Sequence, residues 1–93
     1  VLADRGIEDG VRVNAINPGS IATERLAQRV QRTASDNGTD EAAAARSMTQ
    51  AAGIARFGQP REIAQAVAFL SSPVSGYCQG AVLDIDGGQT RTL

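Results

Sequence analysis

The sequence contains no histidine, no lysine and only one cysteine, Cys78. A single cysteine without histidine excludes a disulfide, a structural zinc site and a Cys/His nucleophilic pair within this chain, so we expect no metal site. All nine basic residues are arginine, which leaves no lysine for a Schiff base, a phosphate-binding loop or lysine-assisted proton transfer. The net charge of −1 provides no basic field for nucleic acid or an anionic membrane, so we expect neither as a partner.

A long apolar run is also absent. The longest uncharged stretch, residues 63–82, is interrupted by glutamines, serines, Pro73 and two glycines, so it cannot cross a bilayer as a helix. No signal peptide is visible, and the single cysteine fits a reduced, cytoplasmic location. The chain begins with Val1 rather than methionine, from which we expect a piece of a longer protein. With 93 residues it forms one domain at most, and its core is thin because so short a chain buries only roughly 60–65% of its surface.

Two segments have the composition of β-strands. Residues 11–16 (VRVNAI) are rich in β-branched side chains, and the turn signal of residues 17–20 (NPGS) predicts their end, because proline lacks a ladder donor and glycine permits the turn. Residues 81–86 (AVLDID) form a second strand, which ends at two glycines.

Helical patterns precede the first strand and separate the two. Residues 1–10 are typical of the frayed end of a helix. We predict three helices between the strands: from Glu24 to about Ser35 with Thr23 as N-cap, from Glu41 to Ala51 with Asp40 as N-cap and Gly53 at its end, and from Pro60 to Leu70. Strand, helices and strand make a crossover unit, which joins parallel strands, so the predicted fold class is α/β. Two parallel strands alone leave apolar faces and an unpaired edge exposed, so we expect further strands in a larger sheet.

Four motifs follow one another along the chain: residues 12–23 (RVNAINPGSIAT), 56–64 (RFGQPREIA), 67–72 (VAFLSS) and 84–88 (DIDGG). Together, in this order and spacing, they resemble the C-terminal portion of the short-chain dehydrogenase/reductase family. The resemblance implies that residues 1–93 are the last third of one Rossmann-type domain, with the last two strands of a doubly wound parallel sheet and a closing helix. It also implies that residues 24–55 are substrate-lid helices; the alternative is a poorly packed pair of surface helices, and whether Met48 faces the substrate stays open between the two.

In this family the turn after the first of these strands lies against the nicotinamide ring. The resemblance therefore assigns cofactor binding to Asn17, Pro18, Gly19, Ile21 and Thr23. Pro18 fixes the backbone, Gly19 has no side chain to obstruct a flat ring, and an N–H near Ile21 and the Thr23 hydroxyl can bond a carboxamide. Thr23 also has a simpler interpretation as a helix N-cap, and the two roles can coexist.

Other polar residues have a structural interpretation. Arg56 and Gly58 suggest a phosphate site, but we favour a helix-end cation and a helix cap. Asp84 and Asp86 suggest a carboxylate pair, but without a partner acid, histidine or metal ligand we expect them to bond turn backbone. Cys78 is interpreted as a small packing residue.

The residues that perform the family's chemistry are missing. The resemblance implies a glycine-rich turn after a first strand, a serine, and a tyrosine followed four positions later by lysine. Tyr77 is the only tyrosine, and Ala81 stands four positions after it. We therefore predict no catalytic residue in this chain, no activity of the chain alone, and packing of Tyr77 at the start of the last strand.

The resemblance implies a parent oxidoreductase that moves a hydride between NAD or NADP and a carbonyl or alcohol substrate. The residues that select NAD or NADP lie outside this sequence. It also implies a homo-oligomer, such as a homotetramer, through residues 63–70 (Ile63 to Leu70) and 82–86 (Val82 to Asp86). Two alternatives are a truncated product that only binds partners or assembles, and an epimerase or dehydratase of the same fold.

Overall fold

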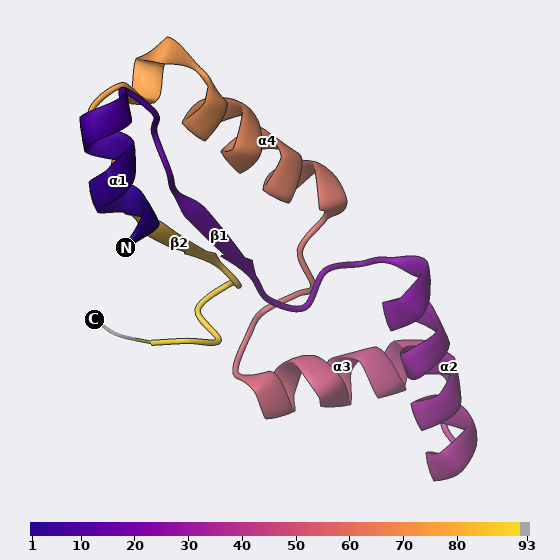
Figure 1. Ribbon diagram of the computed structural model, residues 1–93. Coiled ribbons are helices and arrows are strands. Elements are labelled where there is room, and N and C mark those ends of the chain that lie inside the picture. The colour runs from indigo at the N-terminus through magenta and orange to yellow at the C-terminus, as the bar shows by residue number, and fades with distance from the viewer. Residues whose placement is uncertain (92–93) are drawn as a thin grey trace.

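Helices and short strands alternate in the computed structural model, which describes residues 1–91 (Figure 1). In chain order the elements are α1 (Leu2–Asp9), β1 (Ala15–Pro18), α2 (Glu24–Asn37), α3 (Glu41–Ala52), α4 (Pro60–Ser71), a 3-10 turn (Pro73–Ser75) and β2 (Val82–Ile85). The strands pair in parallel, with Ala15 opposite Val82 and Pro18 opposite Ile85. The predicted α/β crossover unit is therefore confirmed.

The first strand begins later than the sequence predicts. Residues 11–14 lie outside the ladder because the loop before β2 binds their polar groups. The Val13 carbonyl accepts from the Gly80 N–H (2.9 Å), and the Arg12 guanidinium donates to the carbonyls of Ser72 (3.0 Å) and Ser75 (2.8 Å). These contacts fasten the approach to β1 against the chain that leads into β2.

The first strand ends inside the predicted turn signal, at Pro18, two residues later than Ile16, because Asn17 and Pro18 still belong to the ladder. The Ala15 N–H donates to the Ala81 carbonyl just before β2 (2.9 Å), and the Gly19 N–H donates to the Ile85 carbonyl at the end of β2 (3.0 Å). Backbone donors alternate in direction along a strand, so the odd-numbered residues face β2 and the donor that proline lacks would point away from it. Pro18 therefore costs this pair of strands no hydrogen bond.

The predicted N-caps of α2 and α3 are confirmed. The Thr23 hydroxyl oxygen and the Asp40 carboxylate each accept from the backbone N–H three residues on, at 3.3 and 2.7 Å. The helices end at Gly38 and Gly53, whose φ angles of 64° and 72° suit residues without a side chain. Helix α2 thus continues two residues beyond its predicted end, to Asn37.

The two helices form a hairpin with its own small core. Val30, Ala34 and Ala44 are buried there, and Met48 and Phe57 pack against them. The side chain of Met48 is half-buried against this core, and its position relative to a substrate stays a prediction.

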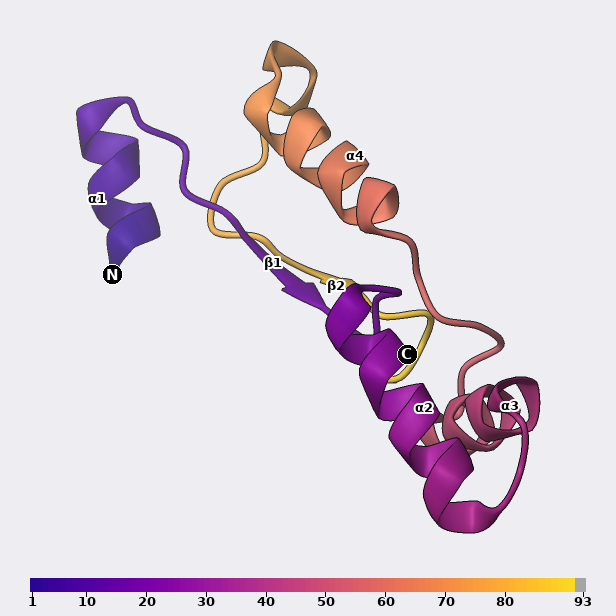
Figure 2. The same ribbon diagram turned by 90° about the vertical axis from the view of Figure 1, so that its right-hand side faces the viewer.

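The chain as a whole is extended. Its radius of gyration is 17.1 Å, whereas a compact domain of this length has about 12 Å. Helices α1 and α4 lie on opposite sides of the strand pair, and the α2–α3 hairpin projects beyond the ends of the strands (Figure 2). In the described residues the hydrophobic core contains only Leu26 and Ile54 besides the three buried residues of the hairpin.

Tyr77 contradicts its predicted packing role. Its side chain is fully exposed on the loop that precedes β2. Its neighbour Cys78 is half-buried, and the Cys78 carbonyl accepts from the Asn14 side chain (3.1 Å). The backbone of this loop and the side chain of Gln79, rather than the aromatic ring, make its hydrogen bonds with the rest of the chain.

Candidate functional site

The turn that leaves β1 is held by hydrogen bonds from two sides. The Gly19 N–H donates to the Ile85 carbonyl at the end of β2 (3.0 Å). On the other side, the Ala22 N–H donates to the Gly58 carbonyl (2.8 Å) and the Gly58 N–H donates to the Ser20 carbonyl (3.0 Å). The backbone of the turn is therefore fixed by two segments that are distant in sequence.

Gly19 is required by its neighbour across the sheet. A Cβ atom at this position would lie 2.6 Å from the Cβ and 2.7 Å from the Cα of Asp86. Carbon atoms in contact are about 3.5–4.0 Å apart, so no larger residue fits without moving backbone. Space for a ligand is thus not needed to explain this glycine.

Thr23 and Ile21 present groups that can bind a ligand. The Thr23 hydroxyl oxygen caps α2, but a hydroxyl that accepts one bond still has its own hydrogen to donate. The Ile21 carbonyl accepts from the Thr23 N–H (2.8 Å), while the Ile21 N–H has no partner among residues 1–91. Two donors are thus available a few residues apart on one turn.

Asn17 lies apart from these donors. Its side-chain amide donates to the Asp84 carboxylate across the two strands (3.1 Å). The expectation that Asp84 bonds turn backbone is therefore wrong. For Asp86 it is confirmed: its carboxylate accepts from the N–H groups of Gly88 (3.0 Å) and Thr90 (2.9 Å), and these bonds lower its pKa.

An open hollow of about 730 Å³ lies beside the turn. Four of the predicted cofactor-binding residues line it: Pro18, Gly19, Ile21 and Thr23. Asn17 does not; it lines a smaller hollow of about 280 Å³ with Asp86. The structure thus brings most of the predicted site residues to one surface.

Sequence reasoning missed half of the lining of this larger hollow: Arg25, Leu26, Arg29, Pro60 and Ile63. The spacing of four between the two arginines was a usable signal, because such residues share one face of a helix. No such signal existed for Pro60 and Ile63 of α4, since only the folded chain brings them beside the turn.

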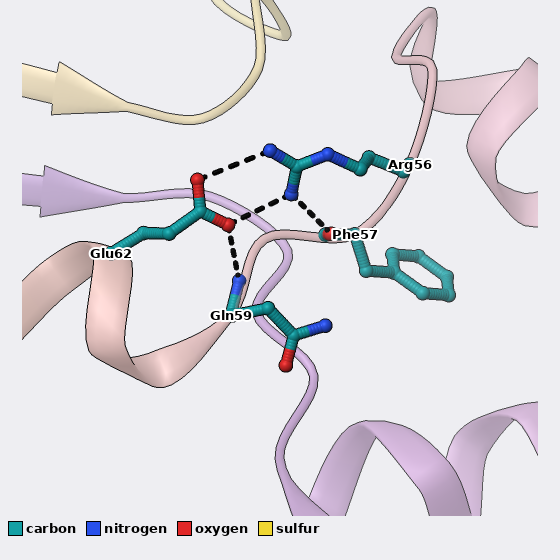
Figure 3. Close-up of polar contacts among 4 residues, drawn as sticks. All are labelled: Arg56, Phe57, Gln59 and Glu62. Carbon is teal, nitrogen blue, oxygen red and sulfur yellow. Dashed lines mark hydrogen bonds and ion pairs between the residues drawn. The ribbon is translucent and has the colours of Figure 1, made fainter.

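A polar cluster supports the segment that holds the turn (Figure 3). The two terminal guanidinium nitrogens of Arg56 donate to the two carboxylate oxygens of Glu62, at 2.8 and 3.1 Å, and Arg56 also donates to the Phe57 carbonyl (3.1 Å). The Glu62 carboxylate accepts in addition from the Gln59 N–H (2.9 Å). The bonds from Arg56, and then from Gln59, lower the pKa of Glu62 to about 2.

This cluster corrects two predictions. Arg56 is not a helix-end cation, because its partner is a carboxylate in the first turn of α4. Gly58 is not a helix cap; it pairs with Ile21 in an isolated parallel bridge, and a Cβ at Gly58 would lie 2.9 Å from the Ile21 side chain. The function of this segment is to hold the turn.

Over residues 1–91, no group of three or more His, Cys, Asp or Glu side chains could hold a metal ion. Within the same part of the chain, no helix is both long and apolar enough to cross a membrane.

Comparison with known proteins relates the whole described chain to one family. Residues 1–90 match the family described as "Enoyl-(Acyl carrier protein) reductase". The 2-keto-3-deoxy-L-fuconate dehydrogenase of Xanthomonas campestris pv. campestris is 46% identical over 82 residues, which is 88% of this chain and 26% of that protein. The galactitol 2-dehydrogenase (L-tagatose-forming) of Cereibacter sphaeroides is 43% identical over 82 residues, 87% of this chain and 28% of that protein.

A solved structure of a reductase also resembles this chain over nearly its whole length. The L-sorbose reductase of Gluconobacter frateurii, in complex with NADPH and L-sorbose, superimposes with a TM-score of 0.88 at 36% identity, over 99% of this chain and 35% of that one. The chain thus spans between 26% and 35% of the length of these three relatives.

Proposed function

Because the chain belongs to the short-chain dehydrogenase/reductase family, we propose that it forms the nicotinamide-side wall and the substrate lid of an NAD- or NADP-dependent oxidoreductase. The substrate of this enzyme is a small carbonyl or alcohol compound. One observation carries the proposal: Pro18, Gly19, Ile21 and Thr23, assigned to the cofactor from sequence, line one hollow beside a turn that is fixed from both sides.

The donors on the turn suit the carboxamide of nicotinamide. The Ile21 N–H and the Thr23 hydroxyl hydrogen can each donate to an oxygen acceptor, and Pro18 offers an apolar surface to the ring. The bound cofactor supplies the hydride chemistry. The residues of this chain hold and orient the ring, and the fixed backbone keeps that orientation constant.

Proton transfer needs residues from outside this sequence. The sequence has no lysine, and its only tyrosine, Tyr77, is exposed on a loop away from the turn. We propose that residues 1–93 are the C-terminal part of one Rossmann-type domain in a longer chain, and that the 93 residues alone are inactive.

The α2–α3 hairpin is suited to act as the lid. The buried residues of the hairpin pack on each other. The hairpin is connected to the two strands and α4 by the chain at Thr23 and at residues 53–58. Such a hairpin can move as one body over a substrate. A second subunit is the proposed partner of residues 63–70 and 82–86, where Val67, Phe69 and Val82 are 49%, 45% and 66% exposed.

The substitution Thr23→Val in the longer enzyme tests the proposal. It removes the hydroxyl donor, which costs about 0.5–1.5 kcal/mol of cofactor binding, or roughly a twofold to tenfold rise in the dissociation constant. The measurement is fluorescence titration of NADH and NADPH. Thr23→Ser keeps the hydroxyl and is expected to bind like the parent.

The control tests whether the loss of a helix cap elsewhere in the hairpin by itself weakens cofactor binding. Asp40→Ala removes the equivalent cap of α3, at 2.7 Å, within the same hairpin and away from the turn. It should fray α3 and leave the cofactor dissociation constant unchanged. Equal affinities of the Thr23→Val variant and the parent for both cofactors would count against the assignment of Thr23.

A further inference from the structure

The hollow beside the turn carries net positive charge. Arg25 and Arg29 are the charged residues of its lining, and none of the lining residues is acidic. The neighbouring hollow on the other side of Ile21 differs, because its lining contains Arg56 together with two carboxylates, those of Glu62 and Asp86. The larger hollow is therefore selectively suited to an anion.

Neither arginine is used by the fold. Within residues 1–91, no hydrogen bond or ion pair involves the guanidinium of Arg25 or Arg29, whereas Arg12 binds Ser75 and Arg56 binds Glu62. The two arginines are four residues apart on α2, so their side chains lie on one helix face, about 6 Å apart along the axis. Two free guanidinium groups at this spacing can hold one carboxylate between them.

The position of these cations indicates which molecule they bind. They lie two and six residues beyond Thr23, in the first and second turns of α2, on the hairpin proposed as the lid, while the proposed nicotinamide contacts come from the turn itself. Pro60, Ile63 and Leu26 line the rest of the hollow with apolar surface, so Arg25 and Arg29 are its only charged groups. The substrate must lie beside the nicotinamide, so it is the molecule that can reach both the nicotinamide ring and the two arginines.

We propose that the substrate is a hydroxy or keto acid, and that Arg25 and Arg29 are the specificity-determining residues that bind its carboxylate. This inference rests on the proposed oxidoreductase function. It adds the class of substrate. It also means that the α2–α3 hairpin binds the substrate carboxylate in addition to covering the substrate.

The test uses the longer enzyme and matched substrate pairs. Each aldonate is compared with the alditol of the same carbon skeleton, and 2-keto-3-deoxy-L-fuconate, the compound named for the Xanthomonas relative, is included. The parent should have a higher kcat/KM for the acids. Arg25→Gln and Arg29→Gln should each lower kcat/KM for the acids roughly 10- to 100-fold, mostly by raising KM. The ratio kcat/KM for the alditols should not change.

Arg32 provides the matched control. It continues the same helix face one turn further on but does not line the hollow, so Arg32→Gln should leave acids and alditols alike unchanged. Arg25→Lys keeps the charge without the planar fork and should fall between the parent and Arg25→Gln. The preference for acids should also decrease at high salt, because both arginines are exposed.

Several outcomes would overturn the inference. These are equal kcat/KM for acids and alditols, turnover of alditols alone, no turnover of any acid by an enzyme that binds cofactor, or an equal loss in the Arg32→Gln variant. A raised dissociation constant for NADH or NADPH in the Arg25→Gln variant would assign the cations to cofactor phosphates instead. An enzyme that binds neither cofactor would refute the proposed function itself, which the same titration detects separately.

Discussion

Gly19→Ala tests how the turn is built. The new methyl carbon would lie 2.6 and 2.7 Å from the Cβ and Cα atoms of Asp86, about 1 Å inside the normal contact distance. Neither side can yield easily, because the Gly19 N–H is bonded to the Ile85 carbonyl and the Asp86 carboxylate is bonded to the loop behind it. Overpacking of this kind typically costs about 1–3 kcal/mol.

The assay is urea unfolding of the longer enzyme without cofactor. We expect the Gly19→Ala variant to have a lower midpoint at an unchanged slope, equivalent to about 1–3 kcal/mol. Asp86→Gly in the same background should not restore stability, since the Asp86 Cα at 2.7 Å remains. Gly38→Ala is the control: a Cβ there has nothing within 4 Å, so only its φ of +64° is unfavourable, and cofactor affinity should stay unchanged.

The result that refutes this reasoning follows from the other interpretation of the residue. If Gly19 is glycine only to leave room for a flat ring, the Gly19→Ala variant without cofactor will be as stable as the parent and only cofactor affinity will fall. The structure predicts the opposite order: lost stability first, and weaker cofactor binding as a result of the displaced turn.

Two further predictions concern stability. The folded-state pKa of Glu62, about 2, lies below its ordinary value of 4.5, so its ionised form stabilises the fold above about pH 4.5, and this contribution is lost as the pH falls toward 2. The melting temperature of Glu62→Gln should therefore lie below that of the parent at pH 7, with a gap that closes toward pH 2 and narrows in 1 M salt; a gap independent of pH would contradict the role of Glu62. The isolated 93-residue chain should show no cooperative thermal transition as a monomer, because the sheet within residues 1–91 has two strands and the radius of gyration is 17.1 Å. A sharp transition at low concentration would disprove this.

Local features of the fold and the parallel pairing of the two strands were predictable, but the contacts that set the limits of β1 were not. Thr23 and Asp40 cap their helices as the sequence indicates, because a cap depends on residues three positions away. The limits of β1 depend instead on partners more than sixty residues later, such as Gly80, which binds Val13 outside the ladder. Pro18 is included in the strand for a related reason, since the effect of a proline depends on which edge of the strand its missing donor faces.

The candidate site shows the same division. The turn residues came from a family resemblance, and the structure gathers Pro18, Gly19, Ile21 and Thr23 on one hollow. The bridge between Ile21 and Gly58 could not be predicted, because it joins two segments on either side of the α2–α3 hairpin. It explains why the turn can be fixed although the hairpin between its two anchor points packs mainly on itself.

Thr23 is the point at which the two proposed roles of the chain meet. Its hydroxyl oxygen accepts from the first turn of α2, and its hydrogen is the donor proposed for the cofactor. A donor to the cofactor polarises the oxygen and strengthens its acceptance from the helix, so cofactor binding and the start of the lid helix support each other. Arg25 and Arg29 follow in the first and second turns of that same helix. The enzyme we propose would therefore position its carboxylate-binding groups best once the nicotinamide is bound, which favours cofactor binding before substrate.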